Sequence, residues 1–318
     1  MTKQCLGILF AATLLASCSK QDGSNADAAS FQPPDRPECI APSKPGGGFD
    51  LTCKLAQKGL MELKLISKPM RVTYQPGGIG AVAYNSIVAQ RPGDGNVIVA
   101  FSGGSLLNLA QGKFGRYGED DVRWIAAEGI DYGMVAVRAD SPFQTLNDLV
   151  DALKQDPTSV VFGAGGTVGS QDWMKSALIA KAAGIDYKAM RYVAFEGGGE
   201  AQTALLGGYI QAYSGDISEE RLPAPFDAVP TAKEQGYDVS WPILRGFYTG
   251  PDVSDADYDW WVAKFDKMMG DQRFDKMRRD IGMFPFAMTG AALDAEIKSR
   301  MAVYRNLAEE FGFTEQTG

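Results

Sequence analysis

The chain has 318 residues, a formal net charge of −8 and no histidine. Its length is sufficient for two domains with cores of ordinary size, and its composition is that of a globular protein. The negative charge argues against nucleic acid and anionic lipid surfaces as partners, because both require a basic face. The lack of histidine removes the commonest general base and the commonest metal ligand.

The first residues predict export. Lys3 is followed by the apolar run "CLGILFAATLLAS", which is too short to span a bilayer and suits a signal-peptide core. The run ends in "LASC", which resembles a bacterial lipobox and predicts a signal peptide over 1–17 with lipid attached to Cys18. An ordinary signal peptide cut nearby is the alternative. Residues 18–37 are small, polar and proline-bearing, which predicts a flexible tether.

The cysteine count also fits an exported protein. Cys5 lies in the signal peptide and Cys18 carries the lipid, so Cys39 and Cys53 remain as an even pair. In a compartment that permits disulfides, this predicts a Cys39–Cys53 bridge, which contributes on the order of 3 kcal/mol in the chain-entropy model. Two buried free thiols are the alternative.

From Cys39 onward, short apolar strands alternate with helical segments. The first strand is expected in "CIAPS", and later strands at Met70–Tyr74, Val97–Phe101, Met134–Val137, Val160–Gly163, Met190–Phe195, Ile210–Ser214 and Ile243–Thr249. Helices are expected at Leu51–Leu63, Ile79–Gln90, Leu146–Lys154, Gln171–Ala183, Glu200–Leu206, Asp255–Met269 and Leu293–Gly312. This alternation predicts an α/β fold with mainly parallel sheets, in which ligands bind at the carboxyl ends of the strands.

Five glycine-rich turns follow strands in this pattern. They are "KPGGGFD" from Lys44, "QPGGIGA" from Gln75, "FSGGS" from Phe101, "GAGGTVGSQD" from Gly163 and "FEGGGEAQ" from Phe195. A helix start exposes N–H groups with partial positive charge, which suits an anion. A turn glycine alone is more often a residue with positive φ. Together, the five turns predict that at least two contact a ligand.

The motifs of common enzymes are absent from the sequence. It contains no GxSxG nucleophile elbow and no GxxxxGK[ST] phosphate loop, and its glycine turns do not fit GxGxxG. No acidic cluster has metal-ligand spacing; "GEDDVRW" at 118–124 is expected to be a solvated loop. We therefore predict a protein that is not an enzyme and that has no cofactor and no metal.

Four segments carry a resemblance to a known family. "ECIAPSKPGGGFDLTCKLAQ", "PGGIGAVAYN", "VPTAKEQGYDV" and "LRGFY" resemble the solute receptor of tripartite tricarboxylate transporters, and the opening is most similar to the citrate-type receptors. The resemblance implies a periplasmic-binding-protein fold, with two lobes that close around a small di- or tricarboxylate. It also implies two integral membrane subunits as partners and a periplasmic location. We expect a monomer.

The chain is expected to pass between the two lobes twice. The strand at Met134–Val137 should carry it out of the first lobe, and "WPILRGFYTG" should bring it back. Lobe one is then 38–137 with 246–318, and lobe two is 138–245. The C-terminal helices should pack on lobe one.

Candidate ligand contacts lie in the turns and where the chain re-enters lobe one. They are Gly46, Gly47, Gly48, Phe49, Asp50, Ser102, Gly103, Gly104, Ser105, Gly165, Gly166, Thr167, Ser170, Ser214, Asp216 and Arg245. Alternatives stay open: Asp50 can be a helix N-cap, Phe49 can pack in the core, and the hydroxyls can cap helices. Arg245 suits a carboxylate ligand but suits a structural ion pair equally well.

Two other functions remain open at this point. One is a receptor that presents its ligand to a sensor kinase, and the other is an uncharacterised enzyme on the same fold. Because there is no histidine, any pH dependence of binding between about pH 6 and 8 is expected to follow the ligand's own ionisation.

Overall fold

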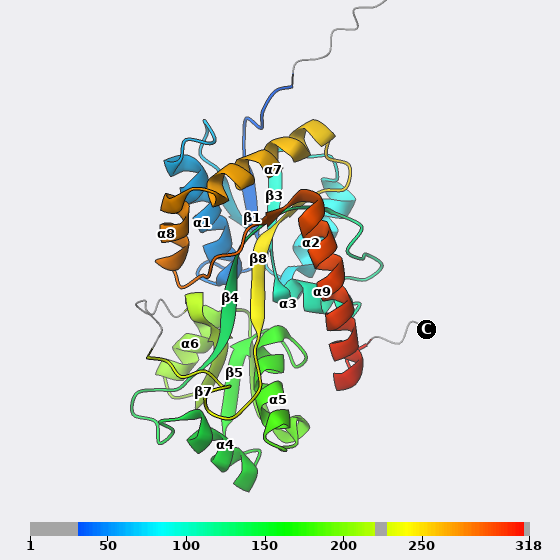
Figure 1. Cartoon of the computed structure of the whole chain (residues 1–318). Helices are drawn as coiled ribbons and strands as arrows, with labels where there is room; N and C mark the ends of the chain where they lie inside the picture. The colour runs from blue at the N-terminus through cyan, green and yellow to red at the C-terminus, as the bar shows by residue number, and fades with distance from the viewer. Residues whose placement is uncertain (1–30, 220–227, 315–318) are drawn as a thin grey trace, which may run out of the picture. The chain divides into compact units, whose positions relative to one another are not determined.

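The computed structural model describes residues 31–219 and 228–314 (Figure 1). The predicted signal peptide at 1–17, the lipid site at Cys18 and the tether up to residue 30 lie outside the described residues. Residues 31–37, at the end of the predicted tether, form no helix or strand.

The described residues form a mixed α/β fold. The strands are β1 (Glu38–Ala41), β2 (Arg71–Tyr74), β3 (Val97–Ser102), β4 (Arg123–Ala136), β5 (Val161–Gly165), β6 (Arg191–Phe195), β7 (Ala212–Asp216), β8 (Pro242–Thr249) and β9 (Met288–Thr289). The α-helices are α1 (Gly48–Glu62), α2 (Ala81–Gln90), α3 (Gly103–Ala110), α4 (Leu146–Gln155), α5 (Gln171–Ala182), α6 (Gly198–Leu206), α7 (Asp255–Met269), α8 (Gln272–Arg279) and α9 (Gly290–Phe311). Short 3₁₀ turns occur at η1 (Gly78–Gly80), η2 (Tyr187–Ala189) and η3 (Ile217–Glu219).

The strands pair in the order β2-β1-β3-β8-β4-β7-β5-β6, and β9 pairs with β4. The pairs of β1 with β2 and β3, and of β5 with β6 and β7, are parallel, as the sequence predicts. The pairs that join these two parallel groups are antiparallel, because β4 and β8 run side by side in opposite directions (Figure 1). The expectation of mainly parallel sheets therefore holds on either side of β4 and β8 and fails where they meet.

Most predicted elements lie within two or three residues of the observed ones. The exceptions are β4, of which Met134–Val137 marks only the end, and three elements that the sequence pattern does not reveal: the short strand β9 and the eight-residue helices α3 and α8. β4 carries Glu128, Gly129 and Asp131 in its interior, and such residues disfavour strands unless a neighbouring strand pairs with them. The loop expected at 118–124 ends early, because Arg123 and Trp124 belong to β4.

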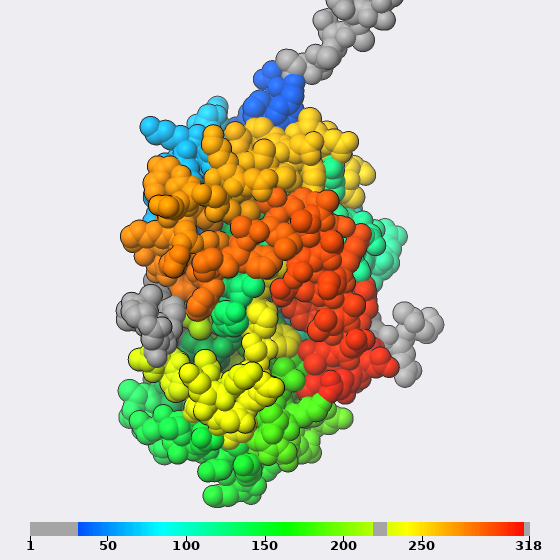
Figure 2. Space-filling model, viewed as in Figure 1, coloured from blue at the N-terminus to red at the C-terminus, as the bar shows by residue number. Residues whose placement is uncertain are grey.

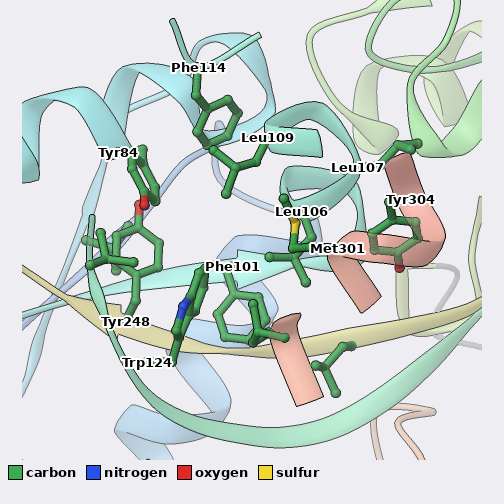
Figure 3. Packing of buried hydrophobic residues seen from close by; sticks show 14 of the residues in the cluster. Tyr84, Phe101, Leu106, Leu107, Leu109, Phe114, Trp124, Tyr248, Met301 and Tyr304 are labelled. Carbon is green, nitrogen blue, oxygen red and sulfur yellow. The ribbon is translucent and has the colours of Figure 1, made fainter. Parts of the chain in front are cut away.

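Aromatic side chains form much of one hydrophobic cluster (Figure 3). Trp124 of β4 contacts Phe101 of β3 and Tyr248 of β8 edge to face, with ring centroids 5.0 and 5.6 Å apart. Leu106 and Leu107 of α3 and Met301 and Tyr304 of α9 belong to the same cluster. Edge-to-face pairs add to the hydrophobic effect, so this cluster fixes β3, β4 and β8 as a unit.

A second cluster lies between α1, α7 and the strands β1, β3 and β8. Cys39 of β1 and Cys53 of α1 form a disulfide in it, with Cα atoms 5.8 Å apart. The predicted pairing is confirmed. Phe49 and Trp261 also lie in this cluster, so the bridge and the packing both hold the start of α1 against the sheet.

The last turn of α9 reaches α5. Phe311 contacts Trp173 and Tyr187, Phe313 contacts Trp173, and Glu310 forms an ion pair with Lys181. In the space-filling view, the end of α9 (red) lies against the green surface near α5 (Figure 2). The C-terminal helix therefore contacts α3 and β4 along its length and α5 at its end.

Candidate functional site

A cleft of about 560 Å³ lies where two of the glycine-rich turns meet. The loop between β1 and α1 contributes Lys44, Pro45 and Gly47 to its lining. The start of α6 contributes Gly197, Gly199, Glu200 and Thr203. This volume is in the range of small-molecule sites, so the cleft is the candidate ligand site.

One ion pair spans the cleft. Lys44 Nζ lies 2.6 Å from Glu200 Oε1, and the two side chains are 54% and 46% exposed. Glu200 Oε2 also accepts a hydrogen bond from the backbone N–H of Glu196, at 3.3 Å. The hydrogen bond to Lys44 lowers the pKa of Glu200, and the same bond raises the pKa of Lys44. Both groups are therefore charged at neutral pH.

Asp50 holds the loop at the start of α1. Its Oδ2 accepts hydrogen bonds from the Gly46 N–H and Lys54 Nζ, each at 2.7 Å, and its Oδ1 accepts one from the Tyr74 hydroxyl at 2.9 Å. The N-cap of α1 is Gly47, not Asp50 as the alternative proposed. The carboxylate of Asp50 and the amide of Gly46 are thus used within the loop, and a φ of +95° at Gly46 explains a glycine there.

Gly48 leaves room for a buried arginine. A Cβ atom at Gly48 would overlap the guanidinium of Arg245. Arg245 is buried and its Nη2 lies 3.0 Å from Asp131 Oδ2 and 2.5 Å from Asp216 Oδ2. These are the contacts of the structural ion pair that the sequence left as an alternative. Asp216 and Arg245, which the sequence predicts as ligand contacts, thus bind each other: Asp216 accepts a hydrogen bond from Arg245, and both side chains are buried.

Lys175 extends this arrangement from α5. Its Nζ lies 2.8 Å from Asp172 Oδ1 and 2.6 Å from Asp216 Oδ1. Five charged side chains, from β4, α5, β7 and β8, therefore form one cluster, called the buried ionic network below: Asp131, Asp172, Lys175, Asp216 and Arg245. Three carboxylates share two cations, so the network carries an excess of negative charge when fully ionised.

The pKa values in the network divide accordingly. Burial raises the pKa of Asp172 to about 6 and also raises that of Asp131. Burial alone would raise the pKa of Asp216 as well, but the charges of Lys175 and Arg245 outweigh it and hold this pKa below its usual range. Burial therefore favours the protonated form of Asp172 and Asp131, and the two cations favour the ionised form of Asp216.

The predicted turn after β3 is a capped helix start. Ser102 Oγ accepts hydrogen bonds from the N–H groups of Gly104 and Ser105, and Ser105 Oγ accepts one from the Ser102 N–H. A Cβ at Gly103 would lie 2.9 Å from the Tyr304 hydroxyl, and a Cβ at Gly104 would lie 3.1 Å from the side-chain amide of Gln171. These four residues are buried and do not line the cleft, so the helix-capping interpretation describes the two serines.

The predicted turn after β5 lies beside the start of α6. A side chain at Gly165 would contact the Cα of Gly197 at 3.4 Å, and Gly166 has a φ of +80°. Ser170 Oγ donates to the carbonyl of Gly165 at 3.3 Å, and Ser214 Oγ donates to the carbonyl of Asp172 at 2.6 Å. Thr167 is exposed. This turn supports the cleft wall without lining it.

Within residues 31–219 and 228–314, no group of three or more metal-ligating side chains is arranged around a common point. In the same residues, no helix combines the length and the apolar character needed to cross a bilayer.

Comparison with known proteins identifies the family. Residues 54–221, more than half of the chain, match the model of the tripartite tricarboxylate transporter family receptor. The chain belongs to this family. The predicted membership of this family is thereby confirmed.

Two curated relatives match this receptor at low sequence identity. It is 24% identical over 190 residues to a UPF0065 protein from the tcbD–tcbE intergenic region of Pseudomonas sp., covering 59% of this chain and 54% of that one. It is 22% identical over 219 residues to a UPF0065 protein from the gbd 5′ region of Cupriavidus necator, covering 61% and 62%. The chain therefore spans between about half and three fifths of the length of these curated relatives.

Solved structures share the receptor's fold over nearly their whole length. The periplasmic binding protein BugD superposes with a TM-score of 0.77 at 17% identity, covering 89% of this chain and 100% of that one. MatC of Rhodopseudomonas palustris, with bound malate, superposes with a TM-score of 0.73 at 16% identity, covering 86% of this chain and 98% of that one. A TctC solute-binding protein from Polaromonas gives 0.60 at 23%, covering 87% and 99%. The predicted periplasmic-binding-protein fold is confirmed.

Sequence reasoning missed several residues of this receptor's cleft and network. Lys44 and Glu200 lie in two of the predicted glycine-rich turns but are not among the predicted contacts. A lysine separated from the glycines only by Pro45 was the available signal. Lys175 gave no signal, because a lysine in an amphipathic helix is normally solvated. Its burial depends on Asp216, which is 41 residues away.

Proposed function

We propose that the protein is a periplasmic solute receptor that binds a small organic di- or tricarboxylate in the cleft between the α1 loop and α6. It passes this ligand to a transporter with two integral membrane subunits. The observation that carries the proposal is the cleft itself, with Lys44 in its lining, in a member of this receptor family.

The two helix starts in the cleft suit an anion. The N-caps of α1 and α6 are Gly47 and Gly197, and neither helix has a side-chain cap. The positive ends of both helix dipoles therefore act on the cleft. Micromolar affinity needs about 8 kcal/mol, and hydrogen bonds to a charged group contribute roughly 1.5–3 kcal/mol each. Four or five such bonds reach this range.

Neighbours of the same fold favour dicarboxylates. MatC holds malate, and another R. palustris protein, with a TM-score of 0.77 at 15% identity, holds adipate. We extend this ligand class to the present receptor. A lipid on Cys18 would hold it at a bacterial membrane, with lobes at 38–137 plus 246–318 and at 138–245.

A ligand screen tests the proposal. Malate, succinate, adipate and citrate are added singly to the mature chain carrying Cys18→Ser, and melting temperature and calorimetric heat are recorded, with glycerol as the uncharged control. At least one acid should raise the melting temperature, because a ligand that binds only the folded state stabilises it. The acid should be recovered unchanged, since turnover would indicate an enzyme. No binding of any acid would overturn the proposed function.

A further inference from the structure

The cleft contains one cation that is accessible to a ligand. Among the described residues that line the cleft, Lys44 alone is positively charged. The two cations of the buried ionic network, Arg245 and Lys175, each contact two carboxylates of the protein in the interior. A ligand carboxylate that enters the cleft therefore meets Lys44 as its partner.

In the present structure, Lys44 is already paired with Glu200. Its Oε1 lies 2.6 Å from Lys44 Nζ, across the cleft, and its carboxylate takes the position of an anionic ligand group. Glu196, in the same turn, adds a second negative charge within electrostatic range of Lys44. An acid that binds here must displace Glu200 from Lys44 or accept its repulsion.

Displacing Glu200 from Lys44 leaves it with another partner. Glu200 is the third residue of α6, and its Oε2 already accepts a hydrogen bond from the N–H of Glu196 at the helix start. A carboxylate at this position is stabilised by the helix dipole and by the exposed amides. The side chain can therefore release Lys44 without losing all of its stabilising contacts.

We propose that Lys44 binds a carboxylate of the ligand and that Glu200 competes for it, so that this pair limits the negative charge of the acids that the cleft accepts. The proposal rests on the proposed function and narrows its ligand class: acids with one or two carboxylates are favoured over tricarboxylates. A ligand with three negative charges gains one cation and meets two glutamates in the same turn.

The test is a calorimetric titration of three probes at neutral pH: butyrate, succinate and citrate. The variants are Glu200→Gln and Lys44→Gln, alone and together. Glu309→Gln on the exposed face of α9 and Lys267→Gln in the last turn of α7 are controls with the same change in charge. Neither control residue lines the cleft. The melting temperature of each unliganded variant shows whether the fold is retained, which is expected because a half-exposed pair contributes little to stability.

Glu200→Gln should raise the affinity for citrate about tenfold and that for butyrate about twofold, because the removed repulsion grows with ligand charge. Lys44→Gln should weaken the binding of all three acids at least about fivefold. In the double variant, it should also abolish most of the affinity gained by Glu200→Gln. The controls should change nothing. An equal change for all three acids, or weaker binding in Glu200→Gln, would overturn the charge limit while leaving the receptor function intact. If the wild-type protein bound none of the three probes or the other acids of the screen, the receptor function itself would fall.

Discussion

The cleft and the buried ionic network are built from the same chemical groups and differ in their access to water. In the cleft, Lys44 and Glu200 form one pair whose side chains are 54% and 46% exposed. In the network, Arg245 and Asp216 are 2% and 4% exposed, and each cation contacts two carboxylates. The distances are nearly equal in the two regions, 2.6 Å in the cleft and 2.5–3.0 Å in the network.

Solvent access decides what each region can do. An exposed ion pair contributes little to stability, so a ligand can replace one of its members. Removing one member of a buried pair leaves an uncompensated charge in a medium of low dielectric constant, which costs several kcal/mol. The contrast assigns ligand exchange to the cleft and support of the strands β4, β7 and β8 to the network.

The largest expected effect comes from removing Arg245. Arg245→Met leaves Asp131 and Asp216 without this cation, and we expect the free energy of unfolding to fall by about 3–5 kcal/mol. Urea denaturation measures it, and Lys44→Met serves as the control, because the loss of an exposed partner should leave the unfolding midpoint nearly unchanged. A stable Arg245→Met protein with greatly weakened binding would instead make Arg245 a ligand contact.

The next effect is a pH dependence of stability. The pKa of Asp172 is raised to about 6 by burial, so the folded protein binds a proton more tightly than the unfolded chain. This stabilisation is complete below about pH 4 and is lost as the pH rises through 6, a change of roughly 3 kcal/mol. Burial also raises the pKa values of Asp131 and Glu128, which adds to the same trend.

Unfolding measured in urea between about pH 4 and 8 checks this trend, and Asp172→Asn should reduce its slope. A wild-type stability that rises over this range would contradict it. The result also bears on the expectation from the histidine-free sequence that the protein has little to titrate between pH 6 and 8, because Asp172 brings a protein group to the lower edge of that range.

Adjacent glycines offer a sharper comparison of the two regions. Gly48→Ala places a Cβ in the guanidinium of Arg245 and should cost at least about 2 kcal/mol of stability. Gly47→Ala meets Ser43 Oγ at 3.5 Å, an ordinary contact, and should cost less than about 1 kcal/mol. Thermal unfolding of both variants measures the difference. Equal losses would mean that Arg245 moves aside without consequence.

The smallest expected effect concerns ligand affinity. Gly47→Val narrows the cleft at the start of α1 and should weaken acid binding at least about tenfold, or 1.4 kcal/mol, with the fold retained. The backbone can accept the change, because φ at Gly47 is −83°. Calorimetry with the best acid of the screen measures it. Full affinity in this variant would mean that the loop only shapes the backbone and that the anion sits elsewhere.

The sequence alone determined the features that depend on short stretches of chain. The α/β alternation follows from local apolar patterns, and α7 begins and ends at the predicted residues. The Cys39–Cys53 bridge follows from the even cysteine count in a protein with an export signal. The glycine turns that open α1 and α6 were also predicted, and both line the cleft. Each of these features depends on residues that lie close together in the chain.

Only the tertiary structure decided which charges meet. Arg245 and Asp131 are 114 residues apart, and Lys44 and Glu200 are 156 apart. Their contacts depend on β8 lying between β3 and β4 and on two helix starts facing one cleft. The residue pattern does not specify that strand order, and a lysine looks the same in sequence whether it is solvated or buried. Burial then fixes the energy of each pair, since the cost of an unpaired charge is set by its distance from water.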